Sequence, residues 1–236
     1  MDDRLRAPQW IDVASPDVQV RERAFIRAAF GWMFLGLLLT AVTAFWVVGS
    51  PAMQQMVFNR GAMLGLILVE LGAVAFLSFR IQKMSPGVAV SVFLGYAILN
   101  GVTLSSICFI YTASSITQAF VVSAGMFGAM SLYGLVTKKD LTSWGSFLFM
   151  GVIGIILTSV LNMFVRSSAL EGTISLIGVF VFVGLTAYHT QKLKAYATVS
   201  GPMSTNFAVI GALSLYLDFV NLFLMLLRLF GGGRRR

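Results

Sequence analysis

The stretch Leu-Ser-Leu-Tyr-Leu-Asp-Phe-Val-Asn-Leu-Phe-Leu-Met-Leu-Leu-Arg-Leu-Phe, residues 213–230, decides the fold of this chain. It is almost long enough to cross a hydrocarbon layer about 30 Å thick, yet it carries Asp218 near its middle. An ionisable side chain inside a bilayer costs roughly 2.5–3.5 kcal/mol on insertion scales and usually faces protein or water, where it serves a pathway or a switch. We therefore expect this segment to be an internal helix wrapped by the other spans.

Two further polar residues of this segment are candidates to support Asp218. Asn221 follows Asp218 by three residues, which places both on the same face of a helix. Tyr216 is expected to add a hydroxyl to that face. Both are predicted to lie in the polar surroundings of the carboxylate.

The composition excludes a soluble domain, because 58% of the residues are hydrophobic, 11% are charged and the mean hydropathy is +0.87. A chain of 236 residues has room for six or seven spans and no separate soluble domain. The predicted organisation is a single seven-helix transmembrane domain over residues 21–230, between a polar tail at 1–20 and a basic tail at 231–236. The net charge of +8 does not indicate nucleic acid, since the basic residues stand in small groups between apolar spans.

The pattern of apolar and polar stretches predicts seven helices. Gly61 and Gly65 have the GxxxG spacing that permits close helix contact. Charge-free residues 84–137 are long enough for two crossings with a turn at 112–115. The expected spans are 28–48 on a helix that begins near Ser15, 61–79, two within 84–137, 144–165, 173–188 continuing to 192, and 206–230, with loops at 166–172 and 197–204.

The distribution of Lys and Arg predicts a cytoplasmic N-terminus. With that orientation, the outer segments that connect the first six spans hold only two basic residues, Arg60 and Arg166. The last segment opposes this rule, because a full crossing places Arg234–Arg236 outside; since the first span usually dominates, we expect a full crossing. The basic residues assigned to the cytoplasm are Arg4, Arg6, Arg21, Arg23, Arg27, Arg80, Lys83, Lys138, Lys139, Lys192 and Lys194.

Several motifs resemble the Bax inhibitor-1 (TMBIM) family in its bacterial branch. They are Ser-Leu-Tyr-Leu-Asp-Phe-Val-Asn-Leu-Phe at 214–223, Met-Ser-Leu-Tyr-Gly at 130–134 before Thr-Lys-Lys-Asp-Leu at 137–141, and Gly-Leu-Thr-Ala-Tyr at 184–188. The resemblance extends from about Arg27 to the C-terminus. It implies a protein of the bacterial inner membrane in which the last of seven helices is central and wrapped by the other six.

The same resemblance implies a pH-sensitive calcium leak that is gated by two aspartates sharing a proton. Asp218 matches the aspartate of the last helix, whereas the position of the span-six aspartate holds His189 in this chain. Glu70 resembles an acid of span two near the pore. Arg80 is the candidate for the basic residue that pairs with the span-six acid in the closed state, and with a histidine there Asp218 could take that acid's place.

The exchange of aspartate for His189 alters the expected chemistry. Two neighbouring carboxylates retain one proton between them, whereas a histidine and an aspartate form a neutral imidazolium–carboxylate pair. Such a pair lacks the excess negative charge that Ca²⁺ requires, yet imidazole still titrates in the physiological range. We expect pH sensitivity to persist more readily than calcium affinity, with Glu70 and Asp218 serving the cation path and as candidate Ca²⁺ ligands. Because His189 is expected near the end of its span and Asp218 deeper, their contact is a hypothesis.

Other classes of function find little support. The chain has no G-x-x-x-x-G-K-[ST] or H-E-x-x-H motif, and its single histidine and single cysteine, Cys108, exclude multi-His and multi-Cys metal centres. We therefore expect no enzyme and no cofactor apart from Ca²⁺ as a transported ion. The competing hypothesis is a non-conducting membrane protein that binds and modulates a partner such as a membrane protease. The expected partners are lipid, calcium ions, protons and, under that hypothesis, another membrane protein.

Overall fold

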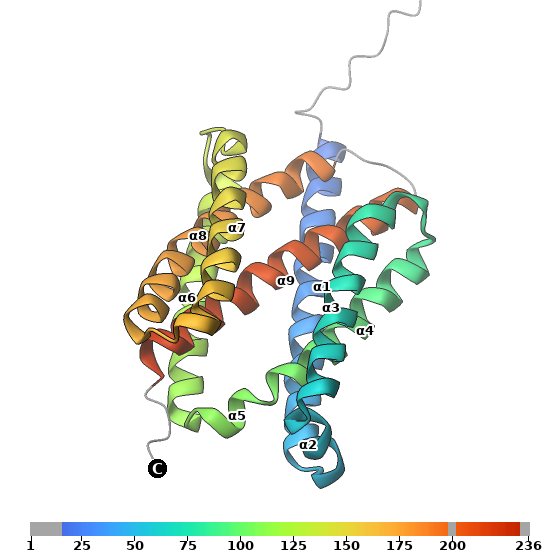
Figure 1. Ribbon diagram of the computed structural model, residues 1–236. Coiled ribbons are helices and arrows are strands. Elements are labelled where there is room, and N and C mark those ends of the chain that lie inside the picture. Colours follow the sequence, from blue (N-terminus) through green and yellow to red (C-terminus); the bar gives the residue numbers. More distant parts are fainter. Residues whose placement is uncertain (1–15, 198–201, 232–236) are drawn as a thin grey trace, which may run out of the picture.

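The computed structural model describes residues 16–197 and 202–231, and these residues form helices joined by short connections (Figure 1). Expectations for residues 1–15, 198–201 and 232–236, which include most of both tails, lie outside the described residues. The helices are α1 (Pro16–Val48), α2 (Pro51–Phe58), α3 (Arg60–Arg80), a 3-10 turn η1 (Ile81–Lys83), α4 (Pro86–Leu104), α5 (Ile107–Ile110), α6 (Ala113–Val136), α7 (Thr142–Val165), α8 (Ser168–Tyr196) and α9 (Pro202–Phe230).

Seven of these segments are long and apolar enough to cross a membrane, as the sequence predicted. They are α1, α3, α4 together with α5, α6, α7, α8 and α9, and the stretches concerned contain 21 to 30 residues. The described part of the chain is therefore an all-α membrane protein with seven spans.

Two helices begin earlier than the sequence indicated. α8 begins at Ser168 rather than Thr173, because the Ser167 side chain accepts a hydrogen bond from the amide of Leu170 and caps the helix. The predicted loop at 166–172 is therefore only two residues long, Arg166 and Ser167. Arg166 caps the C-terminus of α7 with a left-handed backbone conformation, φ 54°. α9 begins at Pro202 rather than near Asn206, which lengthens the last span.

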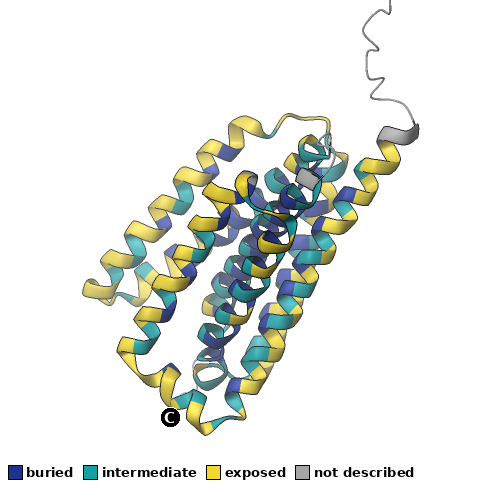
Figure 2. Ribbon diagram, turned by 90° about the vertical axis from the view of Figure 1, so that its right-hand side faces the viewer, coloured by how far each residue is buried: buried dark blue, intermediate teal, exposed yellow. Residues whose placement is uncertain are grey.

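α9 is the most deeply buried of the spans. Within the most apolar stretch of each helix, 67% of α9 is buried, against 44% of α8 and 11% of α7. α9 packs mainly against α1, α4, α6 and α8, while α3 packs on α4 and α7 packs on α8 (Figures 1 and 2). The last helix is thus enclosed principally by four helices rather than by all six.

Close helix contacts occur at glycines other than the predicted pair. A Cβ atom at Gly134 would collide with the backbone of Ala187 on α8, so α6 and α8 need a glycine at this crossing. By contrast, nothing lies within 4 Å of a Cβ built at Gly65, and Gly61 meets only the Asn59 side chain that caps its own helix. The GxxxG spacing of Gly61 and Gly65 permits a close helix contact, but neither glycine makes one with another described helix.

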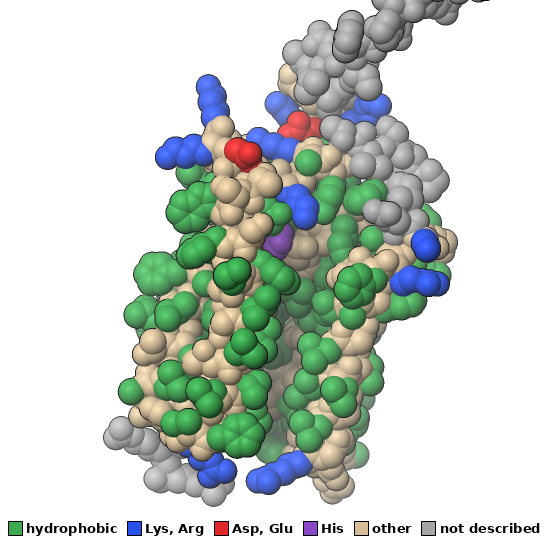
Figure 3. Space-filling view, turned by 45° about the horizontal axis from the view of Figure 1, so that its top comes forward, with side chains coloured by type: hydrophobic (Ala, Val, Ile, Leu, Met, Phe, Trp, Pro, Cys, Tyr) green, Lys and Arg blue, Asp and Glu red, His purple; other side chains and the backbone are tan. Residues whose placement is uncertain are grey.

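Basic side chains gather at one end of the bundle (Figure 3). This end is formed by the start of α1, the end of α3, the connection between α6 and α7, and the end of α8 (Figure 1). α9 begins at this end and its 29 residues, about 43 Å long, run to the opposite end, so it traverses the bundle rather than returning.

Candidate functional site

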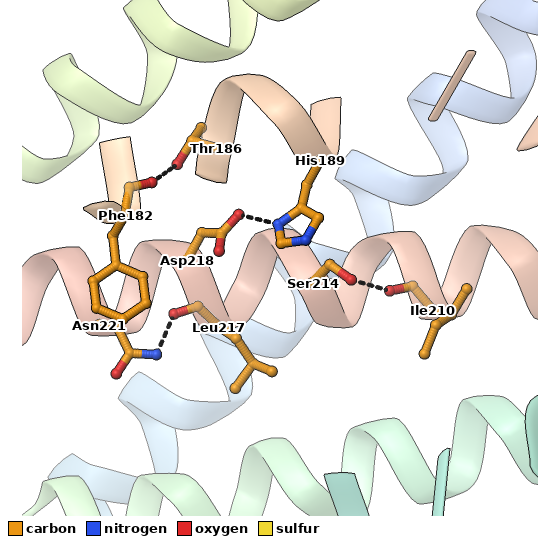
Figure 4. A network of polar contacts seen from close by, with 8 residues as sticks. All are labelled: Phe182, Thr186, His189, Ile210, Ser214, Leu217, Asp218 and Asn221. Atoms are coloured by element: carbon orange, nitrogen blue, oxygen red, sulfur yellow. Dashed lines mark hydrogen bonds and ion pairs between the residues drawn. The ribbon is translucent and has the colours of Figure 1, made fainter. Parts of the chain in front are cut away.

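A salt bridge joins the two most buried helices of the described chain. The Nδ1 atom of His189 on α8 lies 2.7 Å from the Oδ2 atom of Asp218 on α9 (Figure 4). The histidine side chain is 23% exposed, whereas the aspartate side chain is 3% exposed. Of the two side chains, the histidine is therefore the more accessible one, and the carboxylate lies almost fully enclosed behind it.

His189 lies well inside α8. This helix continues for seven residues beyond His189 to Tyr196, or about 10 Å, so that the imidazole lies two turns inside the helix. His189 thus lies in the last third of α8, with Lys192 and Lys194 beyond it, as the sequence placed it. Its contact with Asp218, which the sequence left as a hypothesis, is present in the structure.

Two hydroxyls near the pair bond within their own helices, whereas the buried Thr190 Oγ1, next to His189 in the chain, has no hydrogen-bond partner among the described residues. Thr186 Oγ1 donates to the carbonyl of Phe182 at 2.8 Å, and Ser214 Oγ donates to the carbonyl of Ile210 at 3.0 Å (Figure 4). Among the described residues, no other side chain hydrogen-bonds to Asp218. The imidazole is therefore the group that determines the electrostatic surroundings of the carboxylate.

The two residues predicted to support Asp218 do not contact it. Asn221 donates to the carbonyl of Leu217 on its own helix and points away from His189 (Figure 4). The Tyr216 hydroxyl lies 2.7 Å from Thr40 Oγ1 on α1. Two residues along a helix correspond to a rotation of about 200°, so Tyr216 faces the side of α9 opposite to Asp218. The assignment of Tyr216 to the face of Asp218 was wrong.

Glu70 belongs to a separate polar cluster between α3 and α4. Its side chain is buried, and its Oε1 atom accepts a hydrogen bond from Thr103 Oγ1. Nearby on α4, the amide of Asn100 donates to the hydroxyl of Tyr96 at 3.2 Å. Within the described residues, Glu70 and Asp218 share no contact, so the structure does not join them in one site.

Arg80 does not form the expected ion pair in this conformation. It ends α3, its side chain is exposed, and no acid lies within ion-pair distance of it among the described residues. The connection that follows Arg80 is instead held by Asn206 of α9, whose Nδ2 atom donates to the carbonyls of Ile81 and Met84, each at 2.8 Å. Sequence reasoning missed Asn206, although an asparagine in an apolar span is itself a signal of an internal contact.

The described residues hold no group of three or more His, Cys, Asp and Glu side chains placed to bind a metal ion. Ca²⁺ takes six to eight oxygen ligands, and Glu70 and Asp218 are not brought together to supply several of them. The candidate calcium site at these two acids is not assembled in this conformation.

The fold and this site define a seven-span membrane protein with a buried histidine–aspartate pair between its last two helices. Comparison with known proteins gives the family. Residues 22–235 match the sequence model described as "Inhibitor of apoptosis-promoting Bax1". The chain belongs to the Bax inhibitor-1 family.

Bacterial relatives align over nearly the whole chain. The inner membrane protein YbhL of Escherichia coli K12 is 50% identical over 234 residues, which cover 97% of this chain and 99% of YbhL. An uncharacterized protein of Borreliella burgdorferi is 44% identical, with 89% of this chain and 92% of the relative covered. One of Deinococcus radiodurans is 43% identical, with 95% and 97% covered.

Proposed function

We propose that this protein is a pH-sensitive cation leak of a bacterial inner membrane that passes Ca²⁺, and that the His189–Asp218 pair is its gate. The observation that carries the proposal is the 2.7 Å contact between two ionisable side chains inside the spans. Ionisable residues at such positions are costly and usually serve a pathway. The inner membrane is inferred from the likeness to YbhL. The start of α1 lies at the basic end of the bundle, and basic loops usually face the cytoplasm, so the proposal places the N-terminal side of the first span in the cytoplasm.

The pair has three charge states, and each has a different consequence for a cation. With a protonated imidazole and an ionised carboxylate, the pair is neutral and links α8 to α9 by a charge-assisted hydrogen bond. Loss of the imidazole proton leaves one net negative charge in a poorly hydrated site. Protonation of both groups leaves one positive charge, which repels Ca²⁺.

The negative state favours conduction for two reasons. It weakens the bond that holds α8 against α9, and it supplies an attraction for a cation where few water molecules compete. Because a rise in pH removes the imidazole proton, the leak is expected to be larger at pH 8 than at pH 6. Glu70 is assigned to the same path as a second acid, reached when α3 and α4 move relative to α9.

The test is Ca²⁺ flux into liposomes that contain the purified protein, measured from pH 6 to pH 8. Wild type is compared with Asp218→Asn, which removes the charge and keeps the shape, and with Ser214→Ala as the matched control, since Ser214 lies one turn away and bonds only its own helix. We expect Asp218→Asn to abolish the pH dependence and Ser214→Ala to retain it. His189→Asp restores the acid pair of the family and is expected to increase Ca²⁺ flux.

A wild-type protein that passes no Ca²⁺ at any pH in this range, while His189→Asp does, would contradict calcium conduction by the natural chain. A pH dependence that survives Asp218→Asn would contradict the assignment of the gate.

The separation of Glu70 from Asp218 favours the second candidate, a non-conducting protein that modulates a membrane partner. Under this hypothesis the two clusters serve packing, and the function survives the joint substitution Glu70→Gln and Asp218→Asn. Crosslinking in native membranes distinguishes the two candidates, because a modulator gives one defined crosslinked partner with wild type and with the double variant.

A further inference from the structure

A cavity of about 360 Å³ lies between α1, the α4–α5 segment, α6 and α9. It lies beside the last third of α1 and the first turns of α6, and its lining on α9 begins at Phe219. Its walls are almost entirely apolar, and they include Ala44, Cys108, Phe120, Phe219 and Phe223. The volume is in the range of ligand-binding pockets in proteins, which is about 300–1,000 Å³.

The cavity opens sideways, at a depth where the protein meets acyl chains. Phe45 of α1 and Phe120 of α6 both line it, and they are 75% and 50% exposed. Both residues lie within segments long and apolar enough to span the membrane. The surrounding medium at this mouth is therefore hydrocarbon, and an apolar recess of this kind excludes water.

The last turn of α9, which follows the residues that line the recess, carries a cationic side chain. Arg228 follows the lining residue Phe223 by five residues, about 7.5 Å along α9, and its side chain is exposed. The half-buried Tyr111, between α5 and α6, is within electrostatic range of Arg228. An arginine and a tyrosine at the end of a span are typical of the boundary where lipid headgroups begin.

We propose that this cavity binds one phospholipid molecule, with an acyl chain in the apolar recess and the phosphate beside Arg228. The apolar walls and the single cationic end match an amphiphile with a long tail and an anionic head. An acyl chain held between four helices loses contact with other lipids on several sides, which distinguishes it from lipid that only coats the outer surface. The bound chain touches Phe219, which directly follows Asp218 on α9.

Native mass spectrometry of delipidated protein in detergent, titrated with dioleoyl phosphatidylglycerol, tests the site. Ala44→Phe fills the recess, whereas Val42→Phe adds the same ring on α1 at a position that is 57% exposed and does not line it. We expect Ala44→Phe to weaken lipid binding by roughly tenfold or more and Val42→Phe to leave it unchanged. Arg228→Gln is expected to weaken binding by several fold, because the phosphate loses its cationic neighbour.

The native cysteine gives a second measurement that requires no variant. Cys108 is the only cysteine of the protein and lines the recess, so a bound acyl chain shields it from N-ethylmaleimide. Dioleoyl phosphatidylglycerol is expected to slow its modification, and dihexanoyl phosphatidylglycerol, which has the same headgroup and short tails, is expected not to.

Equal modification rates with the two lipids would overturn the proposal. Equal loss of binding in Ala44→Phe and Val42→Phe, or a retained adduct with the mass of a free fatty acid instead of a phospholipid, would also overturn it.

Discussion

Removing the histidine of the buried pair is expected to destabilise the protein more than neutralising the aspartate. His189→Ala leaves a carboxylate that is 3% exposed without its partner. Breaking a buried ion pair in this way typically costs about 3–5 kcal/mol. Asp218→Asn leaves the imidazole, which is 23% exposed and can be hydrated from the basic end, and the amide oxygen still accepts a hydrogen bond from Nδ1.

Asp218→Asn is therefore expected to lower the free energy of unfolding by about 1–2 kcal/mol, the value of one weakened hydrogen bond. The difference of about 2 kcal/mol between the two variants corresponds to roughly a thirtyfold difference in the unfolding equilibrium constant.

Reversible unfolding in mixed detergent and dodecyl sulfate micelles, followed by circular dichroism, gives these free energies. Ser214→Ala serves as the control for removal of a polar group from the same helix. The double variant His189→Ala with Asp218→Asn completes a mutant cycle, and it is expected to be more stable than His189→Ala alone, since no buried charge remains.

Additive free energies in this cycle, or a larger cost for Asp218→Asn than for His189→Ala, would refute the reasoning. Either result would mean that Asp218 is not an ionised group held by the histidine.

Three further predictions concern the fold around the site. Tyr216→Phe removes the 2.7 Å hydrogen bond to Thr40 and is expected to lower the free energy of unfolding by about 1 kcal/mol, measured by the same micelle assay. Asn206→Ala leaves two carbonyls of the α3–α4 connection without their donor and is expected to lower the free energy of unfolding by about 1–3 kcal/mol. Amide hydrogen exchange in that connection is expected to accelerate, and unchanged exchange would contradict the role of Asn206 in holding it. Hydrogen bonds from Thr142 lower the pKa of the exposed Asp140 carboxyl, so its stabilising effect is present above the ordinary carboxyl pKa and is lost as pH falls through the lowered value. Unfolding of wild type and Asp140→Asn is expected to differ at pH 6 and to converge at low pH.

The sequence predicted the number of spans well because charges and turn residues interrupt the apolar stretches at clear positions. It predicted helix boundaries less well where polar residues continue a helix, as at Ser168 and Pro202. The short helix α2 was missed, although Ser50 followed by Pro51 is a typical helix start. α5 follows a local break at Ser105 and Ser106, which hydropathy does not reveal.

The candidate site was predictable in its residues but not in its contacts. Asp218 and His189 could be chosen from the cost of buried charge and from the family resemblance, whereas their contact depends on how α8 and α9 pack against each other. The opposite orientation of Tyr216 follows from helical rotation and could have been predicted from its spacing to Asp218. The separation of Glu70 from Asp218 depends on which helices pack together, and no local pattern contains that information.

The most direct test of the proposed gate compares two pH curves. His189 is the only histidine of the chain, so a protein labelled with ¹⁵N-histidine gives one imidazole signal whose titration needs no assignment. The account predicts that the midpoint of this titration coincides with the midpoint of Ca²⁺ flux in liposomes of the same lipid composition, and that in Asp218→Asn the flux no longer changes over the pH range in which His189 titrates. A flux that changes over a pH range in which His189 does not titrate would contradict the account.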